Sequence, residues 1–229
     1  MTASAYPSAR LAWNPAYRVI PSRYPAINVF DRVASPADFE ALYALEAMTN
    51  DRLRDEIGQI ELVPPAERLF GPGSGPIMAA FTHLNPLGSR FSDGSYGVFY
   101  CARDADTAIA ETVFHSTRFM AATGEPAMKL PMRLYTVKAG GQVIDLRKVA
   151  VAEPALFDAN EYGPAQALGR RLRAEGVKGI VYPSVRRPKG QCLAAFKPRL
   201  LSNCAHSAYL EYRWTGERID AVFQVSRLA

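Results

Sequence analysis

The order of strand-like and helix-like segments constrains the fold of this chain most strongly. Short apolar stretches with the length and composition of buried strands recur along the sequence, and only a few helix-like stretches stand between them. Strands are predicted over residues 27–33, 97–101, 132–137, 143–146, 179–182, 192–196 and 208–214. Helices are predicted from residue 35, over about 107–119 and over 164–175. Because the two kinds of segment do not alternate strictly, an α+β fold is favoured over a doubly wound parallel sheet.

The predicted helices carry residues that begin and end helices. Ser35 can cap the first, with a proline following it at the first helical position. Asp104 or Asp106 can cap the second. Gly176 follows the third, at the position where a left-handed residue commonly ends a helix.

The chain length of 229 residues is that of one large domain. Residues 1–25 are rich in Pro, Ala, Ser and Tyr and predict an extended N-terminal arm, followed by a domain over 26–229. Within that domain, residues of about 51–85 predict an inserted loop and helix region that contains a Pro/Gly-rich break. We interpret the break as a surface loop, because a small separate module without metal or disulfide would bury too little core.

Composition limits the classes of protein that remain. Hydrophobic residues make up 48% and charged residues 21%, as in folded globular proteins. No apolar stretch approaches the roughly 18 residues that a membrane-spanning helix needs. The net charge of +5 suits an anionic ligand, a nucleic acid or an acidic partner, and does not choose among them.

The cysteines and histidines indicate neither a disulfide framework nor a zinc site. There are three of each, and no two cysteines form a C-x-x-C pair. We therefore expect free thiols and a cytoplasmic location. Two other motifs are also missing: the glycines around Gly73 lack the Gly-Lys-Ser/Thr of a P-loop, and there is no G-x-S-x-G hydrolase elbow.

One segment gathers candidate functional side chains. Arg90 precedes a turn, Tyr100 ends a predicted strand, and Glu111 lies about one turn into the next helix, with His115 on the same face. Each residue alone also fits an ordinary structural role: a surface ion pair, a core aromatic or an exposed helical glutamate. Small and apolar neighbours around Glu111 favour a partly buried carboxylate.

The sequence resembles the RES-domain family, which is named for its Arg, Glu and Ser. The resemblance is carried by Gly-Ser-Arg-Phe over 88–91, by Gly-Val-Phe-Tyr over 97–100, by Thr-Ala-Ile-Ala-Glu over 107–111 and by Gly-Ile-Val-Tyr-Pro-Ser over 179–184. It covers roughly residues 29–196. The family is similar to the ADP-ribosyltransferase fold, which implies a single domain with a mixed, mostly antiparallel sheet flanked by helices.

The resemblance also implies a function. RES proteins resemble toxins of toxin–antitoxin pairs whose substrate is NAD+, with no metal. Some members hydrolyse or phosphorolyse NAD+, and others transfer ADP-ribose to a protein acceptor. The partner that the family implies is a helix-turn-helix antitoxin that covers the active site, and no membrane or direct nucleic-acid contact is expected.

Family roles carry over residue by residue. Arg90 is expected at the NAD+ phosphates or ribose, and Arg32 resembles, more loosely, an early arginine of the family. Tyr100 is expected to stack on nicotinamide or to bind the ribose. Glu111 is expected to act on the ribose, and Ser184 to donate to phosphate or ribose. The sequence departs from the family at Ser92, where members commonly have Asn.

These residue types suit cleavage of the nicotinamide–ribose bond. The reaction builds oxocarbenium character on the ribose, which a fixed carboxylate stabilises. An arginine fork binds phosphate oxygens. The alternative hypothesis is a non-enzymatic, basic nucleic-acid-binding or adaptor module, based on the arginine-rich runs 170–173 and 186–189.

Overall fold

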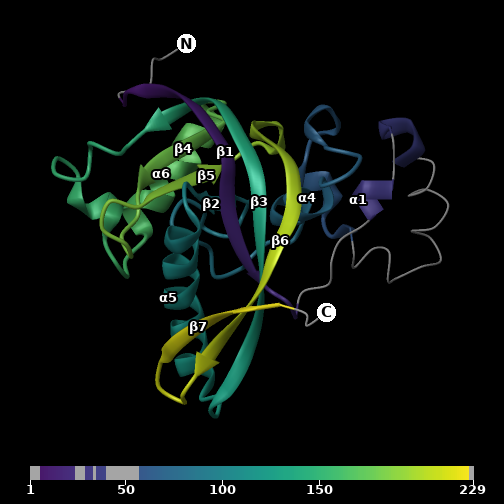
Figure 1. The fold of residues 1–229 in the computed structure, drawn as a ribbon. Coiled ribbons are helices and arrows are strands. Elements are labelled where there is room, and N and C mark those ends of the chain that lie inside the picture. The colour runs from purple at the N-terminus through teal and green to yellow at the C-terminus, as the bar shows by residue number, and fades with distance from the viewer. Residues whose placement is uncertain (1–5, 24–28, 33–34, 40–56, 227–229) are drawn as a thin grey trace.

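A seven-stranded sheet forms the centre of the protein (Figure 1). The computed structural model describes residues 6–23, 29–32, 35–39 and 57–226. The strands are β1 (Ser8–Pro21), β2 (Phe99–Ala102), β3 (Met128–Asp145), β4 (Gly179–Pro183), β5 (Gln191–Ala195), β6 (Leu201–Trp214) and β7 (Ile219–Val225). The helices are α1 (Val29–Arg32), α4 (Gly75–Thr82), α5 (Ala105–Thr123) and α6 (Gly163–Ala174), with short 3-10 turns η1 (Ile60–Leu62), η2 (Pro65–Glu67), η3 (Pro154–Phe157) and η4 (Pro198–Leu200).

The sheet is mixed and mostly antiparallel, which confirms the predicted α+β class. Its order is β1-β2-β5-β4-β3-β6-β7, and β1 pairs with β3 as well. Strands β1, β2, β5, β4 and β3 therefore form a closed ring of pairings, with only β3 and β4 parallel. The β6–β7 hairpin extends beyond this ring from β3.

Residues 8–21, which were expected to belong to an N-terminal arm, lie in the sheet instead. Residues Ser8–Pro21 form β1, which pairs with β3 along its length and meets β2 at the Tyr17–Ala102 pair. Leu11, Trp13 and Ala16 are buried in the core. β1 is thus an integral strand of the domain.

Three other local predictions differ from the structure. The predicted strand over 27–33 is wrong where the chain is described, because Val29–Arg32 is helical. The two strands predicted over 132–137 and 143–146 are one continuous strand, β3, which passes through Gly140 and Gly141. β7 was not predicted at all.

The helix boundaries agree better with the sequence. Ser35 Oγ accepts a hydrogen bond from the amide of Asp38 at 3.2 Å, as an N-cap does, although residues 40–56 of that predicted helix lie outside the described part of the chain. Asp104 caps α5 by accepting from the amide of Thr107, and Gly176 follows α6 with a φ of +80°. α4 lies inside the predicted insertion and begins within its glycine-rich run.

The core has a cluster on each face of the sheet. Leu193 and Ala195 of β5 belong to one cluster, and the alternating Cys192 and Ala194 belong to the other. The first cluster includes side chains of α1 and α4, and the second includes side chains of α5 and α6. Among the described helices, none is long and apolar enough to cross a membrane.

Candidate active site

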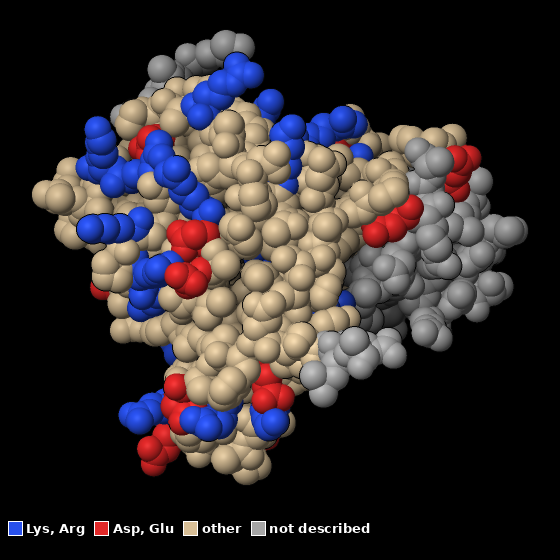
Figure 2. Space-filling model, viewed as in Figure 1, with Lys and Arg blue, Asp and Glu red and all other residues tan. Residues whose placement is uncertain are grey.

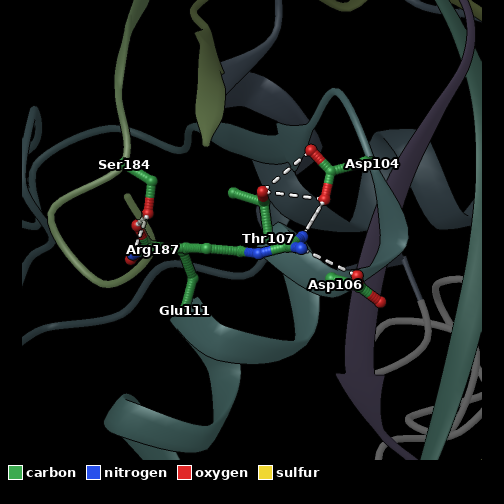
Figure 3. Close-up of polar contacts among 6 residues, drawn as sticks. All are labelled: Asp104, Asp106, Thr107, Glu111, Ser184 and Arg187. Carbon is green, nitrogen blue, oxygen red and sulfur yellow. Dashed lines mark hydrogen bonds and ion pairs between the residues drawn. The ribbon is translucent and has the colours of Figure 1, made fainter. Parts of the chain in front are cut away.

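The carboxylate of Glu111 meets the hydroxyl of Ser184, although the two residues come from distant parts of the chain (Figure 3). Glu111 lies on α5, and Ser184 directly follows β4. Ser184 Oγ donates to Glu111 Oε1 at 2.6 Å, and accepts hydrogen bonds from the amides of Arg186 at 3.1 Å and Arg187 at 3.0 Å. A serine hydroxyl has one proton and two acceptor positions. Because both acceptor positions are filled, the proton points at Glu111.

The hydroxyl of Tyr100 holds the turn that carries Arg90. Tyr100 lies in β2, and its Oη accepts a hydrogen bond from the amide of Phe91 at 3.0 Å. A second hydrogen bond joins this Oη to Ser89 Oγ at 2.8 Å. Burial raises the pKa of Tyr100 to about 12, so the phenol is neutral at ordinary pH.

The guanidinium of Arg90 bridges that turn to η3 and the segment that follows it. Arg90 is buried, and its Nη1 donates to the carbonyls of Leu156 at 3.1 Å and Asp158 at 2.9 Å. The guanidinium also lies over the ring of Tyr162, 4.6 Å from its centroid. Arg90 is therefore fixed in direction before any ligand binds.

Arg186 brings a second guanidinium to the same segment. It lies over the ring of Phe114, 3.2 Å from the centroid, and Nη2 donates to the carbonyl of Ala159 and, at 3.5 Å, to the hydroxyl of Tyr162. The Nε of Arg186 is buried and has no hydrogen-bond partner within the described residues. The sequence singled this residue out as a member of a basic run and as a residue after the 179–184 motif, and assigned it no role at the site.

These side chains form one electrostatic neighbourhood. Burial lowers the pKa of His115; the charge of Glu111 opposes this shift, and Arg186 and Arg90 add to it. Burial likewise raises the pKa of Tyr182 well above its usual range; Cys192, Glu111 and Tyr100 raise it further, and Arg90 opposes the shift. The charges of Glu111 and Arg90 act on both His115 and Tyr182, and Tyr100 acts on Tyr182, so Arg90, Tyr100 and Glu111 lie in one region. Ser184 joins this region through its contact with Glu111.

Cys192 also contacts the carboxylate and is not suited to be a nucleophile. Its Sγ lies 3.7 Å from Glu111 Oε1. Burial raises the pKa of this thiol well above its usual range, and the negative charge of Glu111 raises it further. A thiol held protonated is a weak nucleophile. The described residues, those of this site included, contain no group of three or more His, Cys, Asp or Glu side chains that could hold a metal ion.

The sequence also singled out Arg32, which lies in α1, and Ser92, which lies in the loop after Arg90. Arg32 ends α1, which contacts α4, and its side chain lies outside what the structure describes. Ser92 is buried and closes its own turn, with Oγ donating to the carbonyl of Tyr96 at 2.6 Å and accepting from the amide of Gly94 at 3.2 Å. The serine at this position therefore stabilises the loop after Arg90.

Comparison with known families explains the arrangement of the motifs. The RES domain family matches residues 65–215, which is more than half of the chain. The chain belongs to the RES-domain family. The match contains Arg90, Tyr100, Glu111 and Ser184, whereas Arg32 and β1 lie before it.

Two individual proteins are similar to this RES-domain chain. The uncharacterized protein y4oC of Sinorhizobium fredii (strain NBRC 101917 / NGR234) is 33% identical over 209 residues, which cover 90% of this chain and 86% of that protein. The structure described as the M. tuberculosis MbcT-MbcA toxin-antitoxin complex has a chain with 14% identity and a TM-score of 0.48, with 91% of this chain and 87% of that chain covered.

Proposed function

We propose that this RES-domain protein is a toxin-type enzyme that cleaves the nicotinamide–ribose bond of NAD+. The observation that carries the proposal is a carboxylate, Glu111, fixed by Ser184 beside two oriented guanidiniums, those of Arg90 and Arg186. Membership of the RES family supports NAD+-related toxin activity in general. The site offers negative charge for a cationic ribose and positive charge for a pyrophosphate.

In this proposal Glu111 is the candidate catalytic residue. Loss of nicotinamide leaves oxocarbenium character on the ribose. A carboxylate that is already oriented stabilises this charge without reorganising during the reaction. Nicotinamide leaves as a neutral group from a cationic precursor, so the scheme requires no general acid.

The arginines act on the other half of the substrate. Arg90 and Arg186 have planar forks that match phosphate oxygens and are held by ring faces and main-chain carbonyls. We assign them to the NAD+ phosphates. Tyr100 then contributes through the turn that it holds, and its ring remains a candidate surface for nicotinamide or ribose.

The acceptor of ADP-ribose and the antitoxin complete the proposal. Water, inorganic phosphate or a protein side chain can take the ADP-ribose, giving hydrolysis, phosphorolysis or protein ADP-ribosylation. We propose that the enzyme inhibits growth unless a helix-turn-helix antitoxin covers the site, as the family relationship implies.

The arginine-rich surface is partly neutralised, which argues against the nucleic-acid alternative. In Figure 2, basic side chains gather over the region where Figure 1 labels α6, β4 and β5, and several lie next to acidic ones. Arg170 pairs with Asp93 at 2.7 Å, and Arg187 with Asp104 at 2.6 Å. Salt-sensitive binding of the isolated protein to DNA or RNA at low salt would favour the alternative.

The test is nicotinamide release from NAD+ by the purified protein, with and without phosphate and with cell lysate. We expect release by the wild type and loss of at least about a hundredfold in Glu111→Gln, since removal of one preorganised charge contact has effects of that size. Glu217→Gln, in an exposed turn, is the matched control and should keep full activity. Full activity in a folded Glu111→Gln protein would refute the role of Glu111. The product that carries the ADP-ribose identifies the acceptor as water, phosphate or a protein side chain.

A further inference from the structure

The loop that follows β4 is closed on itself at its base. It begins at Ser184, whose amide donates to the carbonyl of Gly190 at 2.9 Å. Gly190 packs against α5: a Cβ at this position would lie 2.8 Å from Thr107 Oγ1 and 3.0 Å from Ser184 Cβ. The base of the loop therefore rests on the first turn of α5.

A single arginine attaches the rest of the loop to the start of α5 (Figure 3). Arg187 Nη1 lies 2.6 Å from Asp104 Oδ1, and Nη2 lies 2.8 Å from Asp106 Oδ2. Asp104 Oδ1 also accepts the capping hydrogen bond from the amide of Thr107 at 2.8 Å. The same carboxylate thus fixes the beginning of the helix and the position of the loop.

We call the ion pairs of Arg187 with Asp104 and Asp106 the clamp. The clamp is connected to the Ser184–Glu111 contact. The amide of Arg187 is one of the two donors that fill the acceptor positions of Ser184 Oγ. Glu111 lies one helical turn beyond Thr107, on the helix that Asp104 caps. Movement of Arg187 away from Asp104 would withdraw an amide from Ser184, and its hydroxyl proton would no longer be confined to Glu111.

We infer that Arg187 and Asp104 are positioning residues, which hold the Ser184 hydroxyl against Glu111 and so fix the direction of the carboxylate. The inference rests on the proposed function, in which Glu111 acts on the ribose. The ion pair itself is partly exposed, with 38% of the Arg187 side chain and 48% of the Asp104 side chain accessible. Pairs this exposed contribute little to global stability. The clamp therefore acts on geometry at the site more than on the free energy of unfolding.

Two substitutions separate the clamp from the helix cap. Asp104→Asn keeps an N-cap acceptor for Thr107 and removes one of the two carboxylate charges that hold Arg187, while Asp106 remains. Arg187→Gln removes the guanidinium and leaves the cap intact. We expect each to lower kcat for NAD+ consumption by about tenfold, as for a small misplacement of a reacting group, with KM changed by less than about twofold.

A double-mutant cycle tests whether the clamp acts through Ser184. In a Ser184→Ala background, Arg187→Gln should cause no further loss of kcat, because the hydroxyl that it positions is absent. The matched control is Arg213→Gln, which removes a similar exposed pair with Asp220 at 2.8 Å in the β6–β7 hairpin. It should leave kcat unchanged. An unchanged kcat in both clamp variants, or the same loss with and without Ser184, would overturn the inference.

Hydrogen exchange gives a reading that does not depend on activity. The amides of Arg186 and Arg187 should exchange faster in Asp104→Asn than in the wild type, as followed by NMR, while amides in the middle of β3 should not change. Unaltered exchange of both loop amides would refute the clamp. A wild-type protein that releases no nicotinamide would instead refute the proposed function, so the two failures are distinguishable.

Discussion

Single hydroxyl groups determine the geometry of this site. Ser184 donates its one hydroxyl proton to Glu111, and the hydroxyl of Tyr100 accepts a hydrogen bond from the turn before β2. Neither side chain needs to change its charge to do so, and the pKa of Tyr100 is raised to about 12 by burial. Both residues were expected at the substrate from the family resemblance. Their contacts give each of them a second role, in holding the residues around the substrate.

Replacing the tyrosine hydroxyl should destabilise the protein. Tyr100→Phe removes the acceptor for the amide of Phe91 and the partner of Ser89. A donor left without a partner costs about 1–3 kcal/mol of the free energy of unfolding, which urea denaturation measures. Tyr209→Phe is the control, since that side chain is exposed, and it should change stability by less than about 0.5 kcal/mol. Equal stabilities for the two variants would contradict the stabilising role of the hydrogen bonds that the Tyr100 hydroxyl makes.

The candidate residues could be predicted from the sequence, but most of the contacts that they make could not. The motif order along the sequence predicted four candidate residues: Arg90, Tyr100, Glu111 and Ser184. The Arg187–Asp104 pair was not predicted, because its partners are 83 positions apart. Contacts of this kind depend on how strands and helices pack, so they cannot be predicted from a short stretch of sequence.

At the scale of elements, α6 packs directly on the turn that carries Arg90. A Cβ on Gly169 would lie 2.2 Å from the carbonyl oxygen of Phe91 and 3.0 Å from its Cβ. Only a residue without a side chain permits this distance. The position of α6 is therefore coupled to the position of Arg90.

Substituting Gly169 should move the helix away from the turn. We expect Gly169→Ala to lower the free energy of unfolding by about 1–3 kcal/mol, the usual cost of overpacking, despite the higher helix propensity of alanine. Gly163→Ala, at the open start of the same helix, should be neutral or slightly stabilising, because nothing lies within 4 Å of the added methyl. Urea denaturation of both variants checks this. A Gly169→Ala protein as stable as the Gly163 variant would contradict the close packing.

Two of the elements that the sequence did not predict, β1 and α1, share a physical cause. In β1 the side-chain alternation is interrupted by a register shift between Trp13 and Ala16, so the period of two that marks a strand is lost. The helix Val29–Arg32 is only four residues long, too short to show a helical period, and its Asp31 accepts a hydrogen bond from the distant amide of Gly75 at 2.6 Å. Both segments take their conformation from tertiary contacts.

For the molecule as a whole, buried acidic protons predict loss of stability at alkaline pH. Burial raises the pKa of Cys101 and Cys204 from 9.0 to about 12, and those of Tyr96, Tyr100 and Tyr212 from 10.0 to about 12. Between these values the unfolded chain has lost protons that the folded chain keeps. The free energy of unfolding should therefore fall as pH rises from about 9 to 12. Urea midpoints at pH 8, 10 and 11 test this, and a constant midpoint would contradict the burial of these groups.

The pairing of β1 with β3 also has a consequence for the protein while it is being made. β1 ends at Pro21 and β3 begins at Met128, so the first strand leaves the ribosome long before its main partner exists. At roughly 5–20 residues per second, that interval lasts several seconds. Ser184 is synthesised later still, so a nascent chain that carries Glu111 lacks the hydroxyl that orients it. The proposed active site is thus completed only after Ser184 and the loop that follows β4 have been synthesised.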